Sequence, residues 1–290
     1  MKNFEFVKAP DVKAALALLD KEKDNAYLVA GSTNAMVDIR AGKVNDRILI
    51  GIRDIEALSG IKFSRGKITI GAATTISELA ESTLLAKKAP ALFLAANDFA
   101  DPTTRNSATI GGNIANASPA ADTAPPLLAL KADVVIAKKG SKRRVAMEDF
   151  FLGVNKTVLE KDELILAVEF SANPHSAFYK IGLRNAMAIS VVTAAASVRK
   201  DKDGNITDVA IALGSVAPKP VRAFNAEKAV LGKKPEEKVI AAMCKALAKD
   251  ISPINDLRAS AEYRIDVAPV VVKRVFCKAC GICPNEGRTK

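Results

Sequence analysis

The sequence predicts two α+β domains that meet near residue 174 and are followed by a short tail with three cysteines. Ahead of that point, short apolar strands alternate with helical stretches. Beyond it, consecutive strands precede consecutive helical stretches, an order typical of a sheet covered by a layer of helices. The segment Ser-Ala-Asn-Pro-His at 171–175 has the composition of a linker. The predicted domains therefore span residues 1–174 and 175–276, and the tail spans 277–290.

Apolar patterning and capping residues predict the elements of the N-terminal domain. Asp11 precedes a stretch with helical apolar spacing and is a predicted N-cap. Thr75 and Glu78 have the spacing of a capping box, so we expect a helix to open there. The predicted strands cover residues 4–7, 27–30, 48–51, 67–71, 133–137 and 164–170. Further predicted helices cover residues 12–19, 35–40, 86–99 and 123–130.

The C-terminal domain is predicted as a small antiparallel sheet with a helical layer. The sequence Asp-Lys-Asp-Gly-Asn at 201–205 is rich in turn formers and separates two of the strands. The predicted strands cover residues 177–181, 189–196 and 209–213, and the helical stretches cover residues 223–231, 235–251 and 259–276.

Composition narrows the class of protein. The chain has 290 residues, of which 49% are hydrophobic and 26% charged, as in soluble globular proteins. No apolar run has the length that crosses a bilayer, and the first residues lack the apolar stretch of a signal peptide, so we expect a cytoplasmic location. The net charge is +11, but aromatic residues make up only 5% and there is no Trp. We therefore favour a solvated basic surface, or contact with acidic proteins, over nucleic-acid binding.

The most informative segment is Thr-Ile-Gly-Gly-Asn-Ile-Ala-Asn-Ala-Ser-Pro-Ala-Ala-Asp at 109–122, here called the second polar segment. It places glycines and short polar side chains between apolar residues, ahead of a predicted helix. A buried loop that offers backbone N–H groups and short donors to a bound polyanion has this composition. The sequence therefore predicts a phosphate-binding loop near a helix N-terminus.

A first polar segment, Ala-Gly-Ser-Thr-Asn at 30–34, lies between a predicted strand and a predicted helix. Neither segment is a GxGxxG fingerprint or a Walker loop. A turn with side-chain caps explains the first segment at least as well as ligand binding does, and it explains the second less well. A dinucleotide is nevertheless attractive, because its diphosphate is large enough for two loops to share. The sequence shows no catalytic constellation.

Together, the two polar segments resemble the FAD-binding subunit of molybdenum hydroxylases, the flavoproteins of xanthine dehydrogenase and carbon monoxide dehydrogenase. The resemblance runs from the first strand to about Phe276, although many members have a second glycine where this chain has Ser32. Shorter matches lie at residues 70–72, 105–106, 178–180 and 258–264.

The resemblance implies roles for individual residues. The first polar segment and its flanks would wrap the FAD diphosphate, the second would oppose it, and Asp122 would bond sugar or ribityl hydroxyls. Phe99 would lie against the flavin ring, and Ile165 would pack near the adenine or flavin edge, although ordinary core packing also explains both residues. Lys180 would lie near the isoalloxazine and stabilise negative charge on reduced flavin, although a surface lysine at the end of a strand explains it equally well. The implied cofactor-binding residues are Leu28, Val29, Ala30, Gly31, Ser32, Thr33, Asn34, Ala35, Phe99, Thr109, Ile110, Gly111, Gly112, Asn113, Asn116, Asp122, Ile165 and Lys180.

The implied fold is a two-part FAD-binding domain of the vanillyl-alcohol-oxidase (PCMH) type, followed by a small α+β domain. The implied role is that of an oxidoreductase subunit in a heteromeric complex. A large subunit would hydroxylate the substrate at a molybdenum cofactor, and [2Fe–2S] clusters of a small subunit would carry the electrons away. FAD on this chain would deliver them to an acceptor such as NAD, so we expect no substrate pocket here.

The cysteines of the tail depart from the family pattern. Cys277, Cys280 and Cys283, followed by Pro284, match the opening of a ferredoxin-type [4Fe–4S] motif. No fourth cysteine follows, so the fourth ligand would be Cys244, a partner's residue or none. Three thiolates also suit zinc with one outside ligand, and a tail of unligated thiols explains them without any metal. We favour metal or cluster binding, because this spacing rarely arises by chance.

Two other functions compete with the FAD-carrying subunit. One is an iron–sulfur adaptor that keeps the fold, uses the C-terminal cysteines and has lost flavin. The other is a basic nucleic-acid-binding module. We rank them in that order, well behind the flavin subunit.

Overall fold

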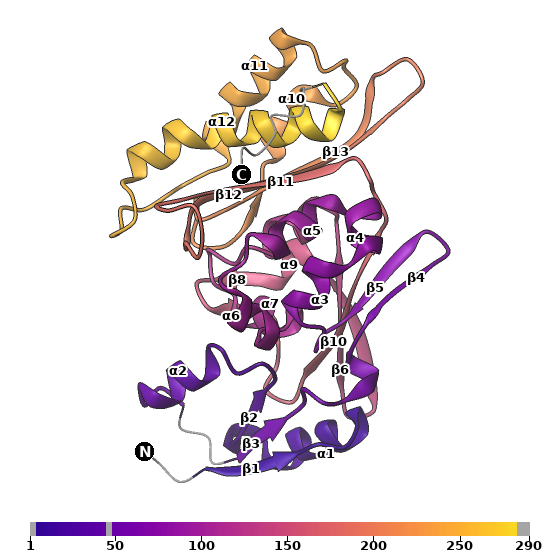
Figure 1. Ribbon diagram of the computed structural model, residues 1–290, viewed down its shortest axis with the longest axis vertical. Coiled ribbons are helices and arrows are strands. Elements are labelled where there is room, and N and C mark those ends of the chain that lie inside the picture. Colours follow the sequence, from indigo (N-terminus) through magenta and orange to yellow (C-terminus); the bar gives the residue numbers. More distant parts are fainter. Residues whose placement is uncertain (1–3, 45–47, 283–290) are drawn as a thin grey trace.

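The computed structural model describes residues 4–44 and 48–282 and stacks two α+β domains along its long axis (Figure 1). The predicted fold class is confirmed, with mixed helix and sheet in both halves. The strand β10, which ends the first domain, finishes at Ser171, and β11, which opens the second, begins at Ser176. Among the described residues, no helix is both long and apolar enough to span a membrane.

A small parallel sheet with strand order β1-β3-β2 forms one end of the molecule. Helix α1 packs on it and begins where Asp11 accepts a 2.7 Å hydrogen bond from the Ala14 N–H, as the sequence predicts. The short helix α2 lies beyond the end of β2 (Figure 1). The elements are β1 (Glu5–Lys8), α1 (Val12–Glu22), η1 (Lys23–Asn25), β2 (Ala26–Val29), α2 (Ala35–Arg40) and β3 (Ile48–Gly51).

An antiparallel sheet with strand order β4-β5-β10-β6-β7 forms the middle of the molecule, and short helices cover it. The capping box of Thr75 and Glu78 is present at the start of α3. The strands are β4 (Ile61–Ser64), β5 (Lys67–Gly71), β6 (Asp133–Lys138), β7 (Ser141–Ala146), β8 (Phe151–Gly153), β9 (Lys156–Thr157) and β10 (Leu164–Ser171). The helices are η2 (Glu56–Leu58), α3 (Ile76–Glu81), α4 (Thr83–Lys88), α5 (Pro90–Asn97), α6 (Pro102–Ser107), α7 (Ile110–Asn116), α8 (Ala124–Ala129) and α9 (Met147–Phe150).

The single helix predicted over residues 86–99 is wrong. The chain breaks at Ala89, which is extended at φ −151°, and a new helix begins at Pro90. Proline disfavours helical backbone at the residue before it and suits the first position of a helix. The break therefore follows from Pro90, which the apolar pattern conceals.

The C-terminal domain is an antiparallel sheet of order β11-β12-β13-β14 between two helical layers. Helices α10 to α12 cover one face, whereas α5 and α8 of the first domain pack against the other (Figure 1). Along β12, Ala195 joins the core of the first domain while Ala194 and Ala196 join that of the second, as strand alternation requires. The elements are β11 (Ser176–Gly182), β12 (Ser190–Lys200), β13 (Ile206–Gly214), β14 (Val221–Arg222), α10 (Phe224–Val230), α11 (Glu237–Ala246), η3 (Leu247–Lys249) and α12 (Ala261–Cys280).

Candidate functional site

The first polar segment forms an open turn between β2 and α2. Ser32 has the left-handed φ of +59°, which reverses the chain immediately after the strand. The backbone N–H groups of residues 31–35 donate to no acceptor within the part of the chain that the structure describes. Consecutive N–H groups around a left-handed residue form a concave anion-binding nest. This turn can therefore hold a phosphate.

The second polar segment is different, and the loop expected at residues 109–113 is wrong. These residues open helix α7, and the Thr109 hydroxyl caps it by accepting from the Gly112 N–H at 3.1 Å. The N–H groups of Ile110 and Gly111 donate to Thr74 O and Ala72 O at 3.0 and 2.8 Å. The protein itself thus uses the backbone donors that the sequence offered to an anion.

Glycines bring the two polar segments close together. A Cβ added to Gly31 would lie 1.8 Å from the carbonyl oxygen of Ser107, just ahead of the second segment. A Cβ on Gly111 would lie 2.7 Å from the carbonyl oxygen of Ala72. Backbone therefore packs directly on backbone at both places, which only glycine permits.

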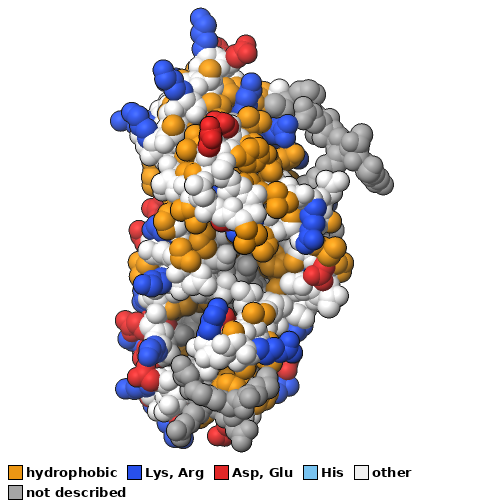
Figure 2. Space-filling model, turned by 90° about the vertical axis from the view of Figure 1, so that its left-hand side faces the viewer, with side chains coloured by type: hydrophobic (Ala, Val, Ile, Leu, Met, Phe, Trp, Pro, Cys, Tyr) orange, Lys and Arg blue, Asp and Glu red, His pale blue; other side chains and the backbone are white. Residues whose placement is uncertain are grey.

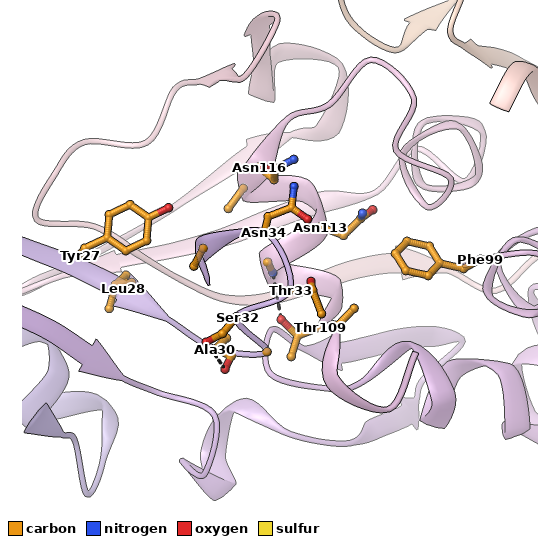
Figure 3. Close-up of a pocket in the computed structure, with 15 residues that line it drawn as sticks. Tyr27, Leu28, Ala30, Ser32, Thr33, Asn34, Phe99, Thr109, Asn113 and Asn116 are labelled. Atoms are coloured by element: carbon orange, nitrogen blue, oxygen red, sulfur yellow. Dashed lines mark hydrogen bonds between the residues drawn. The ribbon is translucent and has the colours of Figure 1, made fainter. Parts of the chain in front are cut away.

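A pocket of about 300 Å³ lies between the two segments (Figure 3). Among the described residues that line it, none has a charged side chain. Predicted residues on its wall are Leu28, Ala30, Gly31, Ser32, Thr33, Asn34, Ala35, Phe99, Thr109, Gly112, Asn113 and Asn116. The sequence reasoning missed Tyr27, Ala108 and Ala115. Tyr27 precedes Leu28 on β2, so its position in the strand that leads into the first polar segment could have identified it.

A second, larger cavity of about 510 Å³ adjoins the first and opens between the two domains. Phe99, Asn34, Asn113 and Asn116 line both cavities, so together they form one elongated site. Asp122 lines the second cavity. The C-terminal domain adds walls that the sequence reasoning missed, among them Met187, Ala188, Ile189, Ser215, Asp256, Arg258 and Arg264. Arg258 and Arg264 belong to a family match seen in the sequence, which was the available signal.

Asp122 forms a buried ion pair across the domain boundary. Its Oδ2 lies 2.6 Å from Lys180 Nζ on β11, and the two side chains are 8% and 7% exposed. Lys180 also donates to Asp98 O at 3.1 Å. Asp122 Oδ1 is buried and has no hydrogen-bond partner among the residues that the structure describes. Burial raises the pKa of Asp122 to about 6, although the Lys180 charge and hydrogen bond oppose this rise.

Several predicted residues do not line either cavity. Val29, Ile110 and Gly111 are buried behind the walls. Ile165 lies in β10 and packs in the core, 5% exposed, and its place near the adenine or flavin edge stays a prediction. Lys180 reaches the cavity through its contact with Asp122 instead of lining it.

The structure places two of the tail cysteines inside a helix. Cys277 and Cys280 are buried in the last turn of α12, where they pack in the core of the C-terminal domain. The Cys244 thiol lies 3.6 Å from Pro269 O. Within the described residues, no group of three or more Cys, His, Asp or Glu side chains is placed to hold a metal. Cys283 lies outside those residues, so a cluster or zinc site stays a prediction from spacing.

Two family models match the chain. Residues 2–171 match the FAD binding domain in molybdopterin dehydrogenase, and residues 177–279 match the CO dehydrogenase flavoprotein C-terminal domain. The xanthine dehydrogenase FAD-binding subunit of Escherichia coli O157:H7 is 33% identical over 89% of this chain and 90% of its own. The carbon monoxide dehydrogenase medium chain of Hydrogenophaga pseudoflava is 30% identical over 97% and 98%.

Solved structures agree with these sequence matches. A carbon monoxide dehydrogenase structure from Hydrogenophaga pseudoflava superimposes with a TM-score of 0.92 and 31% identity, over 98% of this chain and 99% of that one. A Cu,Mo-CO dehydrogenase structure gives a TM-score of 0.91 at 28% identity, over 97% and 99%. The resemblance seen in the sequence is thereby confirmed. The chain belongs to the family of FAD-binding subunits of molybdenum hydroxylases and is an oxidoreductase component.

Proposed function

We propose that this chain carries FAD in the elongated site and transfers electrons within a molybdenum hydroxylase complex. The electrons would come from the [2Fe–2S] clusters of a small partner subunit, and the molybdenum cofactor would belong to a large one. The acceptor would be NAD or a compound of similar role. Relatives named as a medium chain and as an FAD-binding subunit support this assembly.

The observation that carries the proposal is the open nest at residues 31–35. Buried or half-buried backbone N–H groups nearly always find partners in a folded protein. Here half-buried Gly31, Ser32 and Ala35 line a pocket, and their N–H groups make no hydrogen bond inside the described chain. A diphosphate supplies the acceptors that this nest lacks.

The rest of the elongated site suits the remainder of FAD. Phe99 lies where the two cavities join and offers an aromatic face to a ring system (Figure 3). Asp122 Oδ1 is a buried acceptor that a ligand hydroxyl would satisfy. FAD, when bound, supplies one- and two-electron chemistry. The chain's own residues would bind FAD, orient it and exclude water from it.

The surface also supports a heteromeric complex. Figure 2 shows a face on which hydrophobic side chains gather over the middle and upper parts. Val154, Met187, Ile189 and Ile254 are all more than half exposed and line the second cavity. Exposed apolar groups around a cavity mark surfaces that a partner covers.

Purified protein tests the proposal directly. We expect a yellow protein that releases about one FAD per chain on denaturation, and an apoprotein whose FAD titration quenches flavin fluorescence. Iron and sulfide analysis of the same sample tests the adaptor alternative. A colourless protein that takes up no FAD would contradict the proposal, and iron with sulfide but no flavin would favour the adaptor.

A further inference from the structure

Lys180 has a geometry that differs from the role implied by the family resemblance. Its ammonium does not line either cavity, because Asp122 Oδ2 and Asp98 O hold it at 2.6 and 3.1 Å. Asp122, in contrast, lines the second cavity and has one buried oxygen without a partner. The Lys180 ammonium therefore lies on the side of Asp122 that faces away from the cavity, and Asp122 Oδ1 is the atom left to contact a ligand.

We propose that Lys180 is a positioning residue, which holds Asp122 ionised and fixed by one oxygen so that the other accepts a hydroxyl of bound FAD. The inference rests on the proposed function. It makes the C-terminal domain a contributor to cofactor affinity, because Lys180 lies on β11 and Asp122 precedes α8 of the first domain.

Electrostatics supports this arrangement. A buried carboxylate resists ionisation, and desolvation is the largest influence on the pKa of Asp122. The charge and hydrogen bond of Lys180 lower its pKa, whereas Asp98 raises it, and together they leave the pKa at about 6. Without Lys180 only the raising influences remain, so Asp122 would be protonated at neutral pH.

FAD affinity measured against pH, on apoprotein of the full chain, tests the proposal. In the parent we expect affinity to fall as pH decreases through about 6. Lys180→Met should bind FAD about tenfold more weakly at pH 7.5. The midpoint pH, at which affinity falls to half of its high-pH value, should rise by about one pH unit or more in this variant. Lys180→Arg should restore most of the affinity and keep the midpoint near that of the parent.

Lys131→Met is a matched control. Lys131 also forms an ion pair across the domain boundary, with Asp208 on β13, but both side chains are nearly half exposed and neither lines a cavity. Its removal should leave FAD affinity and the pH midpoint unchanged. The double variant Lys180→Met with Asp122→Asn should bind FAD no more weakly than Asp122→Asn alone, since Lys180 acts through Asp122.

The outcomes separate the two proposals. If the parent binds no FAD, the proposed function fails. If the parent binds FAD and a folded Lys180→Met keeps the same affinity and midpoint, the positioning role alone is overturned. Additive losses in the double variant would overturn it as well, because Lys180 would then act on FAD directly. If Lys180→Met does not fold, Lys180→Gln, which keeps a donor without the charge, carries the same comparison.

Discussion

The two polar segments are similar in composition, but they differ in whether the protein itself supplies acceptors for their backbone N–H groups. In the first, the N–H groups of residues 31–35 have no acceptor within the described chain. In the second, the N–H groups of residues 110–113 all donate to Thr74, Ala72 or Thr109. The first segment therefore keeps backbone donors open, whereas the second has its donors satisfied by the protein and contributes side chains to the pocket wall. Glycine and short polar residues indicate close backbone packing, but they do not say what the backbone packs against.

The largest expected effect comes from the glycine that joins the segments. Gly31→Ala places a methyl group 1.8 Å from Ser107 O, so the segments must separate. We expect a loss of about 3 kcal/mol in folding free energy and about 100-fold in FAD affinity, measured by denaturant unfolding and FAD titration. Gly153→Ala, where a Cβ meets open space, is the control and should change neither. Normal FAD binding by Gly31→Ala would mean that the close approach is not needed.

The cap of the second segment tests whether its backbone binds the ligand. Thr109→Ala removes the acceptor of the Gly112 N–H and should lower stability by about 1 kcal/mol, with FAD affinity within about threefold of the parent. Ser82→Ala is a comparable loss of a hydroxyl cap, at the start of α4 and outside both cavity walls, and it should cost a similar amount. A tenfold drop in FAD affinity for Thr109→Ala, but not for its control, would mean that the second segment also donates to the ligand. The two segments would then not differ in this respect.

Relief of backbone strain in the first segment should increase the stability of the fold. Ser32 has a left-handed backbone, which costs a residue with a side chain more than it costs glycine. Ser32→Gly should therefore raise stability by about 0.5 kcal/mol, and FAD binding should persist because the backbone is the donor. Ser32→Ala keeps the strain and removes only the hydroxyl. If Ser32→Ala loses affinity, the hydroxyl contributes to binding and the nest alone does not explain the site.

The smallest expected effect is that of salt. The pocket between the segments has no charged wall, so a diphosphate there would be held by backbone dipoles at short range. We expect FAD affinity to change less than about threefold between low and high ionic strength, because screening acts mainly on exposed, separated charges. A steep salt dependence in the same titration would point to lysine or arginine as the anion's partner, despite the net charge of +11 being distributed elsewhere.

Local signals in the sequence were sufficient for much of the fold. Asp11 and Thr75 cap the helices that they were expected to cap, because capping depends only on residues three positions apart. The predicted linker at 171–175 overlaps the end of β10 at Ser171, and residues 172–175 connect that strand to β11. Apolar periodicity missed the break at Ala89 and the helix at residues 110–116, because both depend on a proline or on contacts from distant strands.

The candidate site divides in the same way. By itself the sequence predicted a polar turn after β2, an anion-binding loop at residues 109–122 and glycines that allow a close approach, and the family resemblance added FAD as the expected ligand. Only the tertiary structure decided which backbone donors remain open, because Ala72 and Thr74 must fold against α7 before its N–H groups are satisfied. It likewise placed Lys180 behind Asp122, since residues 58 positions apart meet only when the two domains pack together.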